Sequence, residues 1–117
     1  MPLPRPIPDP LGELIARRLQ VLGQPLRIRL IDQLERHGEV SVQALADEAA
    51  VSVHNASQHL GILREAGVVG RRQSGRTAYY KLADTSALTV YELVSSSISE
   101  QFRHIGRKLV QGDDAGL

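Results

Sequence analysis

Several residue types are scarce or missing in this sequence. It contains no cysteine, which excludes disulfide bonds, thiolate metal sites and thiol-based redox sensing. Its aromatic residues are three tyrosines and one phenylalanine, too few for the exposed rings on which single-stranded nucleic acid stacks. No apolar run is long enough for a signal peptide or a membrane span. We therefore expect a cytoplasmic protein with no membrane partner.

The patterns that mark enzymes are missing as well. No Ser–His–Asp set or pair of carboxylates falls in a predicted cleft, and no glycine-rich phosphate loop is present. We therefore expect no catalytic residues.

Charge is nearly balanced over the whole chain, with a formal net charge of +1, but it is unevenly distributed. Between residues 52 and 83 there are five cations, and Glu65 is the one anion. Such local clustering sets the electric field that a phosphate backbone meets. This segment is therefore the candidate for contact with nucleic acid.

The 117 residues are enough for one domain with a single core. We expect a flexible proline-rich arm over residues 1–8, a domain over residues 9–110, and a flexible tail over residues 111–117. Asp9 is a plausible N-cap with Pro10 at the first helical position. The hydrophobic spacing then predicts helices over residues 10–22, 25–37, 42–49, 53–66 and 85–110.

A hairpin is predicted between the fourth and fifth helices. Its strands cover residues 68–73 and 76–82, and Ser74-Gly75 forms the turn. Ser41 and Ser52 are suited to cap the third and fourth helices, which a short connection joins as a helix-turn-helix. The expected fold is mainly α with a small β-hairpin (α+β): a winged helix-turn-helix in the order α-α-α-α-β-β-α.

Polar side chains occupy the start of the helix at 53–66. Asn and Gln can bond adenine through two atoms, and Ser and His can reach a base or a phosphate. The alternative is a polar face that contacts only solvent. The adjacent basic hairpin favours duplex DNA as the partner. The predicted DNA contacts of this helix are Ser52, His54, Asn55, Ser57, Gln58 and His59.

The hairpin carries a group of cationic and polar side chains near its tip. Arginine is suited to phosphate contact and to insertion into a narrow minor groove. The alternative is that these charges protect an edge strand from aggregation. The predicted wing contacts with DNA are Arg71, Arg72, Gln73 and Arg76.

The last helix carries an apolar stripe at helical spacing, and the first helix carries another. Because nothing follows the hairpin for this long stripe to pack against, we expect a symmetric homodimer. Packing within a monomer is the alternative. The predicted interface residues are Leu14, Tyr91, Val94, Ile98, Phe102 and Ile105.

Three segments resemble the ArsR/SmtB family of winged helix-turn-helix repressors. They are LGQPLRIRLI at 22–31, SQHLGILREAGVV at 57–69 and GRTAYYKL at 75–82. The resemblance covers roughly residues 11–110 and implies a homodimeric repressor that binds an inverted-repeat operator and leaves it when an inducer binds. A winged-helix protein-interaction module, or a co-regulator without direct metal sensing, is the alternative. A second regulatory protein is a further candidate partner.

The metal sites of that family are poorly preserved. Serine and glutamine stand where thiolates would be in the segment at 39–44. The positions that resemble the zinc site of the last helix hold Asp84, Ser86, Ser97 and Glu100, so both imidazoles are replaced by hydroxyls. Two carboxylates and two hydroxyls make a poor zinc or nickel site.

Two interpretations of the remaining carboxylates stay open. Asp84 could cap the last helix, and Glu100 could be a solvated charge. Alternatively, Glu100 and His104, four residues apart, could bind nickel or zinc weakly together with Asp84 of a partner chain. We therefore expect no required cofactor.

Overall fold

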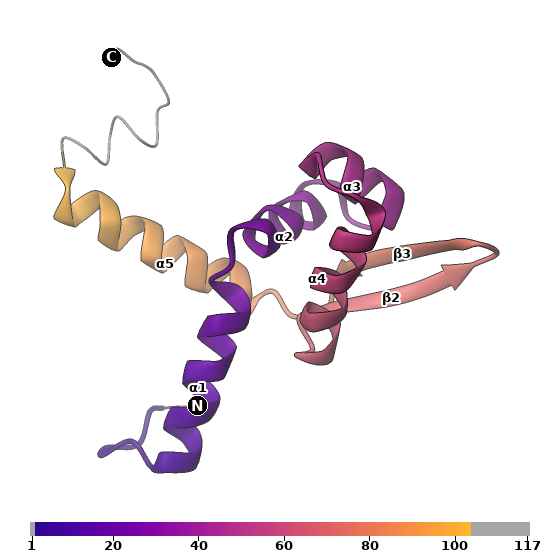
Figure 1. Cartoon of the computed structure of the whole chain (residues 1–117). Coiled ribbons are helices and arrows are strands. Elements are labelled where there is room, and N and C mark those ends of the chain that lie inside the picture. The colour runs from indigo at the N-terminus through magenta and orange to yellow at the C-terminus, as the bar shows by residue number, and fades with distance from the viewer. Residues whose placement is uncertain (1, 104–117) are drawn as a thin grey trace. The chain divides into compact units, whose positions relative to one another are not determined.

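The computed structural model describes residues 2–103, in the element order α1–α2–β1–α3–α4–β2–β3–α5 (Figure 1). The chain divides between Asp84 and Thr85 into two compact units. Residues 2–8 contain no helix or strand. The continuation of the last helix to residue 110, the tail at 111–117, and the predicted roles of His104 and Ile105 lie outside the described residues.

The first helix, α1 (Asp9–Leu22), begins one residue earlier than expected. Pro8 takes the N-cap position and Asp9 is already helical, so the prediction that Asp9 is the cap is wrong. Pro10 still lies in the first turn, where a missing N–H costs no helical hydrogen bond. The Asp9 carboxylate instead lies in the first turn, where negative charge is favourable.

The core helix α2 (Pro25–His37) has the bounds that the sequence predicts. Gln24 caps its start, because its side-chain oxygen accepts a hydrogen bond from the backbone N–H of Arg27 at 3.1 Å. Gly38 ends it with φ +82°, a conformation that favours glycine. The helix supplies much of the core of the first unit, including the fully buried Leu30 and Ile31.

The helix-turn-helix consists of α3 (Val42–Ala49) and α4 (Val53–Glu65). Ser41 and Ser52 cap the two helices as predicted, each accepting a backbone N–H through its hydroxyl oxygen, at 3.1 and 3.0 Å respectively. Between the helices, Ala50 adopts the left-handed conformation with φ +58°. Leu45, Leu60 and Leu63 are fully buried, so both helices pack on the same core as α2.

The sheet has three antiparallel strands in the order β1–β3–β2, and the sequence predicts only two of them. The missed strand, β1 (Val40–Ser41), pairs with β3 (Thr77–Leu82) through Val40 and Tyr80. Two residues are too few to show an alternating pattern, which explains the omission. The strand β1 anchors the base of the wing to the segment just before α3.

The turn of the hairpin is shifted by one residue from its predicted place. Ser74, the last residue of β2 (Val69–Ser74), pairs with Thr77, so Gly75 and Arg76 form the two-residue turn. Gly75 has φ +61° at the first central position, which glycine occupies in a type II′ turn. Arg76 therefore lies at the tip of the wing rather than in a strand.

The second unit contains α5 (Ser86–Gln101). Thr85 takes the N-cap position without a side-chain hydrogen bond, and Asp84, the cap that one of the two open interpretations names, lies one residue before it. Within residues 2–103 no helix is long and apolar enough to cross a membrane. The observed element order confirms the winged helix-turn-helix and its mainly helical class.

Candidate nucleic-acid interface

The first turns of α4 present a row of polar side chains. The Ser52 hydroxyl oxygen accepts the N–H of Asn55, so Ser52 already serves as the cap. Ser52, His54 and Gln58 are exposed, whereas Asn55, Ser57 and His59 are half-buried. The apolar side of the same helix, at Leu60 and Leu63, is fully buried. The helix therefore turns its polar side outward, as a helix that enters a DNA groove must.

His59 differs from the other polar residues of α4, because the fold supplies it with a partner. Its Nδ1 accepts a hydrogen bond from the Nε of Arg27 on α2, at 3.1 Å. Burial, and then the positive charge of Arg27, lower the pKa of His59 below its ordinary value. The imidazole is therefore neutral at pH 7. Its predicted contact with DNA stays a prediction.

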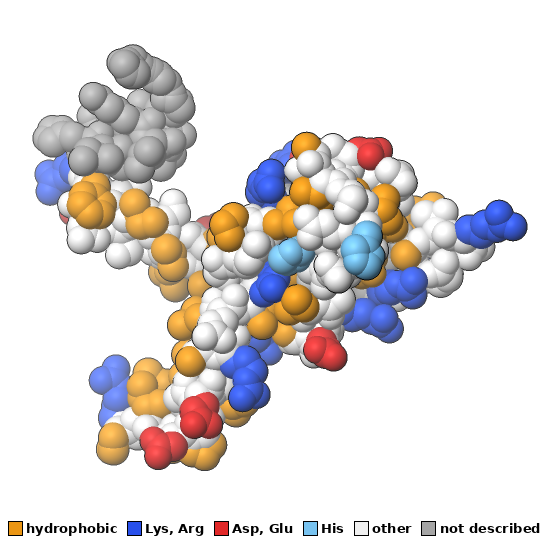
Figure 2. All heavy atoms as spheres, viewed as in Figure 1, with side chains coloured by type: hydrophobic (Ala, Val, Ile, Leu, Met, Phe, Trp, Pro, Cys, Tyr) orange, Lys and Arg blue, Asp and Glu red, His pale blue; other side chains and the backbone are white. Residues whose placement is uncertain are grey.

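At the tip of the wing, polar side chains interact with one another. An Nη of Arg71 donates to the side-chain oxygen of Gln73 at 2.6 Å, and the Gln73 amide nitrogen donates to the carbonyl of Gly75 at 3.0 Å. Arg71, Gln73 and Arg76 are all exposed. Figure 2 shows cationic side chains along the hairpin and at its far end. The tip thus combines positive charge with an ordered backbone.

Arg72, which pairs with Tyr79 in the middle of the wing, is held by two neighbours. Its Nε and an Nη donate to the two carboxylate oxygens of Glu39, at 3.1 and 2.9 Å. Its guanidinium carbon also lies 4.8 Å from the centre of the Tyr79 ring. The hydrogen bonds from Arg72 lower the pKa of Glu39, so the carboxylate stays ionised at neutral pH. The predicted DNA contact of Arg72 would therefore have to compete with this ion pair.

The predicted dimer residues that the structure describes are mostly exposed. Tyr91 is half-buried. Leu14 on α1 is 56% exposed, Val94 and Ile98 on α5 are 51% and 43% exposed, and Phe102, the residue that caps the end of α5, is 46% exposed. Leu93, which is not part of the predicted stripe, is also 66% exposed. Apolar side chains exposed in series along one helix are typical of an interaction surface.

Each candidate metal carboxylate lies near an arginine. An Nη of Arg18 is 3.8 Å from Asp84, and an Nη of Arg103 is 3.8 Å from Glu100. Among residues 2–103 no three His, Asp or Glu side chains are grouped so that they could hold a metal ion. The residues at the positions of the family's zinc site, Asp84, Ser86, Ser97 and Glu100, offer two carboxylates and two hydroxyls, a ligand set that does not suit zinc.

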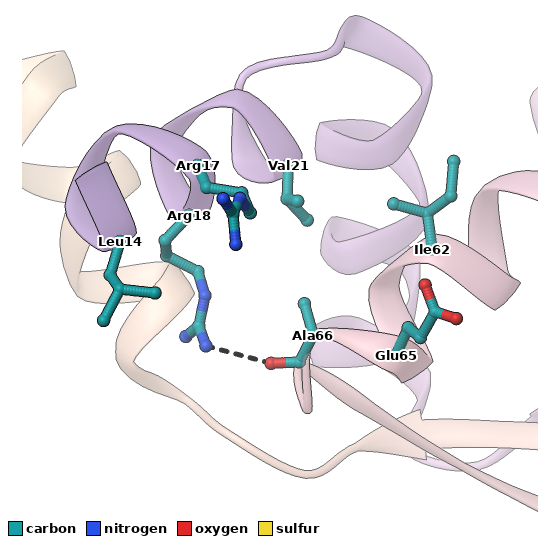
Figure 3. A pocket seen from close by; sticks show the side chains of 7 residues that line it. All are labelled: Leu14, Arg17, Arg18, Val21, Ile62, Glu65 and Ala66. Carbon is teal, nitrogen blue, oxygen red and sulfur yellow. Dashed lines mark hydrogen bonds between the residues drawn. The ribbon is translucent and has the colours of Figure 1, made fainter. Parts of the chain in front are cut away.

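A groove with a volume of about 390 Å³ lies between α1 and the C-terminal half of α4. Figure 3 shows Arg18 reaching across it to the end of α4, where an Nη donates to the carbonyl of Ala66 at 3.0 Å. Leu14, Val21 and Ile62 supply apolar walls, and Arg17 and Glu65 add charges. The groove thus lies on the side of α4 that faces α1.

Two residues that contact predicted DNA-binding side chains, Arg27 and Glu39, are not predicted from the sequence. Arg27 contacts His59 across 32 positions of the sequence, and Glu39 contacts Arg72 across 33. The sequence carries no signal that separates Arg27 from the other charged residues of α2, which are Arg29, Asp32, Glu35 and Arg36. Glu39 lies in a short connection and shows no signal either.

Comparison with known proteins agrees with this geometry. Residues 22–72 match the family model of a helix-turn-helix domain. The chain is 45% identical over 83 residues to the HTH-type transcriptional repressor SmtB of Mycobacterium tuberculosis, covering 71% of this chain and 58% of that repressor. It is 33% identical over 90 residues to the biofilm growth-associated repressor of Agrobacterium fabrum, covering 77% of this chain and 76% of that protein.

A solved structure shows the same arrangement of elements. It is the homodimeric winged helix-turn-helix DNA-binding domain of Mb0332 from Mycobacterium bovis, a possible ArsR-family transcriptional regulator. The TM-score is 0.69 at 28% identity, over 82% of this chain and 88% of that domain. This family consists of transcriptional regulators and not of enzymes. The chain belongs to the ArsR/SmtB family of winged helix-turn-helix transcriptional regulators.

Proposed function

We propose that this chain is a homodimeric transcriptional repressor that binds an inverted-repeat operator in duplex DNA. The observation that carries the proposal is the exposed polar start of α4 in the same compact unit as the cationic wing. In this proposal α4 enters the major groove and reads base edges, and the wing contacts phosphates. Duplex DNA is the partner because phosphate attraction and base reading occur on neighbouring elements.

The homodimer rests on a separate observation. The apolar stripe of α5 leaves Val94, Ile98 and Phe102 each 43–51% exposed. A second copy packed against the stripe would bury these side chains. The related domain of Mb0332 is a homodimer. Two copies related by a twofold axis place their recognition helices roughly 34 Å apart, about one turn of the duplex. The operator should then contain two half-sites in inverted orientation at that spacing.

Regulation in this proposal does not depend on a tightly bound metal. The carboxylates of Asp84 and Glu100 lie near arginines, and both imidazole positions hold serine. Weak binding of nickel or zinc remains part of the proposal, without a strong effect on DNA affinity. The release signal would then be a different effector or a second regulatory protein, which must bind the free and the DNA-bound states unequally.

Selection from a pool of random duplexes tests the function directly. The purified chain is incubated with the pool at low and at moderate salt, and the retained sequences are read. We expect enrichment of one half-site that occurs twice in inverted orientation, and affinity that falls steeply with salt. A scrambled version of the selected duplex is the control. Absence of duplex binding at low salt would favour a protein-interaction module.

A further inference from the structure

Arg27 joins three helices of the first unit through its own hydrogen bonds. Its backbone N–H donates to the cap residue Gln24, which begins α2. One Nη donates to the carbonyl of Val21 in the last turn of α1, at 3.1 Å. Its Nε donates to the Nδ1 of His59 on α4, at 3.1 Å. The position of the His59 ring is therefore tied to the ends of two other helices.

The chemistry of the guanidinium determines which nitrogen of His59 carries the proton. A guanidinium has only donors, so the Nδ1 that it meets must offer a lone pair and cannot carry a hydrogen. A neutral imidazole with an unprotonated Nδ1 carries its hydrogen on Nε2. The positive charge of Arg27 also opposes a second proton on the ring. Arg27 thus selects one tautomer of a neutral ring.

The second nitrogen of His59 is available for an outside partner. Within residues 2–103 the Nε2 has no hydrogen-bond partner, and the ring is half-buried rather than enclosed. His59 follows the exposed Gln58 and lies four positions after Asn55, so His59 and Asn55 share one face of α4. Figure 2 shows imidazole side chains at the surface in this part of the molecule.

We propose that Arg27 is a positioning residue that holds His59 in the Nε2–H tautomer, so that α4 presents a neutral donor to a hydrogen-bond acceptor on the duplex. This inference rests on the proposed DNA-binding function. Acceptors of that kind on the duplex are guanine O6 and N7, adenine N7, thymine O4 and the phosphate oxygens. As a neutral donor, His59 adds one directed hydrogen bond and no charge.

The first test examines the free protein and needs no DNA. Nitrogen-15 NMR of the imidazoles at pH 7 should show His59 with a protonated Nε2 and an unprotonated Nδ1. In the Arg27→Met variant the tautomers should mix, because the donor to Nδ1 is gone. A wild-type His59 that is protonated on Nδ1, or on both nitrogens, would overturn the proposal.

Two substitutions of His59 test the donor while Arg27 stays in place. Gln can place an amide N–H near the position of Nε2, so His59→Gln should bind the selected operator within about twofold of wild type. Asn can offer an oxygen near Nδ1 but reaches no further, so His59→Asn should bind roughly two- to twelvefold more weakly, the worth of one hydrogen bond. Equal affinities of the two variants would overturn the proposal.

Salt dependence separates a neutral donor from a cation. The slope of log affinity against log salt should be the same for wild type and His59→Asn, because no phosphate charge is neutralised by a neutral ring. A slope that falls by about 0.9 would identify His59 as a cation and overturn the proposal. If His59→Asn loses affinity only for duplexes with certain base pairs, the acceptor is on a base edge. If it loses affinity for all duplexes equally, the acceptor is a phosphate. Either result supports His59 as a hydrogen-bond donor.

Failure of the proposed function remains distinguishable from failure of this inference. If wild type binds no duplex, the repressor proposal fails while the NMR result still stands on its own. Because Arg27 also bonds Val21, Arg27→Met could loosen the fold, but both His59 variants leave the hydrogen bond from Arg27 to Val21 in place and so test the donor without that loss.

Discussion

Individual side chains on the candidate interface differ in whether the fold already uses them. Gln58 and Arg76 are exposed at the two ends of the proposed DNA surface, on α4 and at the tip of the wing. His59 and Arg72, by contrast, each make a long-range hydrogen bond inside the protein. Substitutions at the first pair should therefore affect DNA binding and leave the fold intact.

For Gln58 we expect a loss of sequence preference. Gln58→Ala should weaken binding to the best operator by about 1–3 kcal/mol if the amide bonds a base edge, and should weaken binding to poorer sites less. Arg76→Ala is the comparison: it should weaken all duplexes alike and flatten the salt dependence. Competition binding over a set of operator variants measures both. An unchanged ranking of those variants in Gln58→Ala would exclude Gln58 as a base reader.

A substitution of Glu39 should strengthen DNA binding rather than weaken it. Glu39→Gln removes the negative charge that holds Arg72, so the guanidinium becomes available to a phosphate. DNA affinity should rise, and the salt slope should steepen by about 0.9 for the one added phosphate contact. Glu35→Gln, at another exposed carboxylate of the chain, controls for the loss of charge alone. The same slope in both variants would show that Arg72 stays at its internal position.

Helix α4 as an element depends on its first turn for both stability and recognition. The cap residue Ser52 is exposed, and its hydroxyl satisfies the N–H of Asn55 inside the helix. The same residue is a predicted DNA contact. Two substitutions at this one position can separate the roles, because aspartate also caps helices well but carries a negative charge.

Ser52→Ala should lower the free energy of unfolding by about 1 kcal/mol, the usual worth of a serine cap. Ser52→Asp should keep the cap and stay close to wild type in stability. Its carboxylate would nevertheless repel the phosphates, so operator affinity should fall more in Ser52→Asp than in Ser52→Ala. Urea denaturation and operator titration measure the two effects. Undiminished DNA binding by Ser52→Asp would place this turn away from the duplex.

The molecule as a whole is proposed to work as a dimer through α5. Ile98→Asp would bury a charge without a partner in each copy, which is costly, so the protein should dissociate or unfold and lose operator affinity. Ser96→Asp adds the same charge to a helical position well away from the stripe and should leave the dimer intact. Analytical ultracentrifugation measures the oligomeric state. An intact dimer of Ile98→Asp would show that α5 does not form the dimer interface.

Metal response is also a property of the assembled molecule. Calorimetric titration should show nickel and zinc binding in the micromolar range or weaker, an order-of-magnitude expectation for carboxylate and hydroxyl ligands. Ser86→His combined with Ser97→His should bind zinc much more tightly, because two imidazoles and two carboxylates suit this ion. Nanomolar metal binding by the natural sequence, with release of DNA, would contradict the proposed mode of regulation.

Much of the fold can be predicted from the sequence because it depends on neighbours along the chain. The caps at Ser41 and Ser52 each bond an N–H three residues away, and Gly38 ends α2 in a conformation that favours glycine. Apolar spacing marks the buried sides of the helices, including Leu60 and Leu63. The helix-turn-helix and its outward polar face follow from these local rules.

Tertiary structure alone decides which distant residues meet. Asp84 has the chemistry of a helix cap, but it pairs with Arg18, 66 positions away, and Thr85 takes the cap. His59 and Arg72 resemble free DNA contacts, yet packing places Arg27 and Glu39 against them. A residue's own neighbours set its helical or extended preference, whereas its hydrogen-bond partner depends on how whole elements pack. That difference is why the outward polar side of α4 was predictable from the sequence and the hydrogen-bond partner of His59 was not.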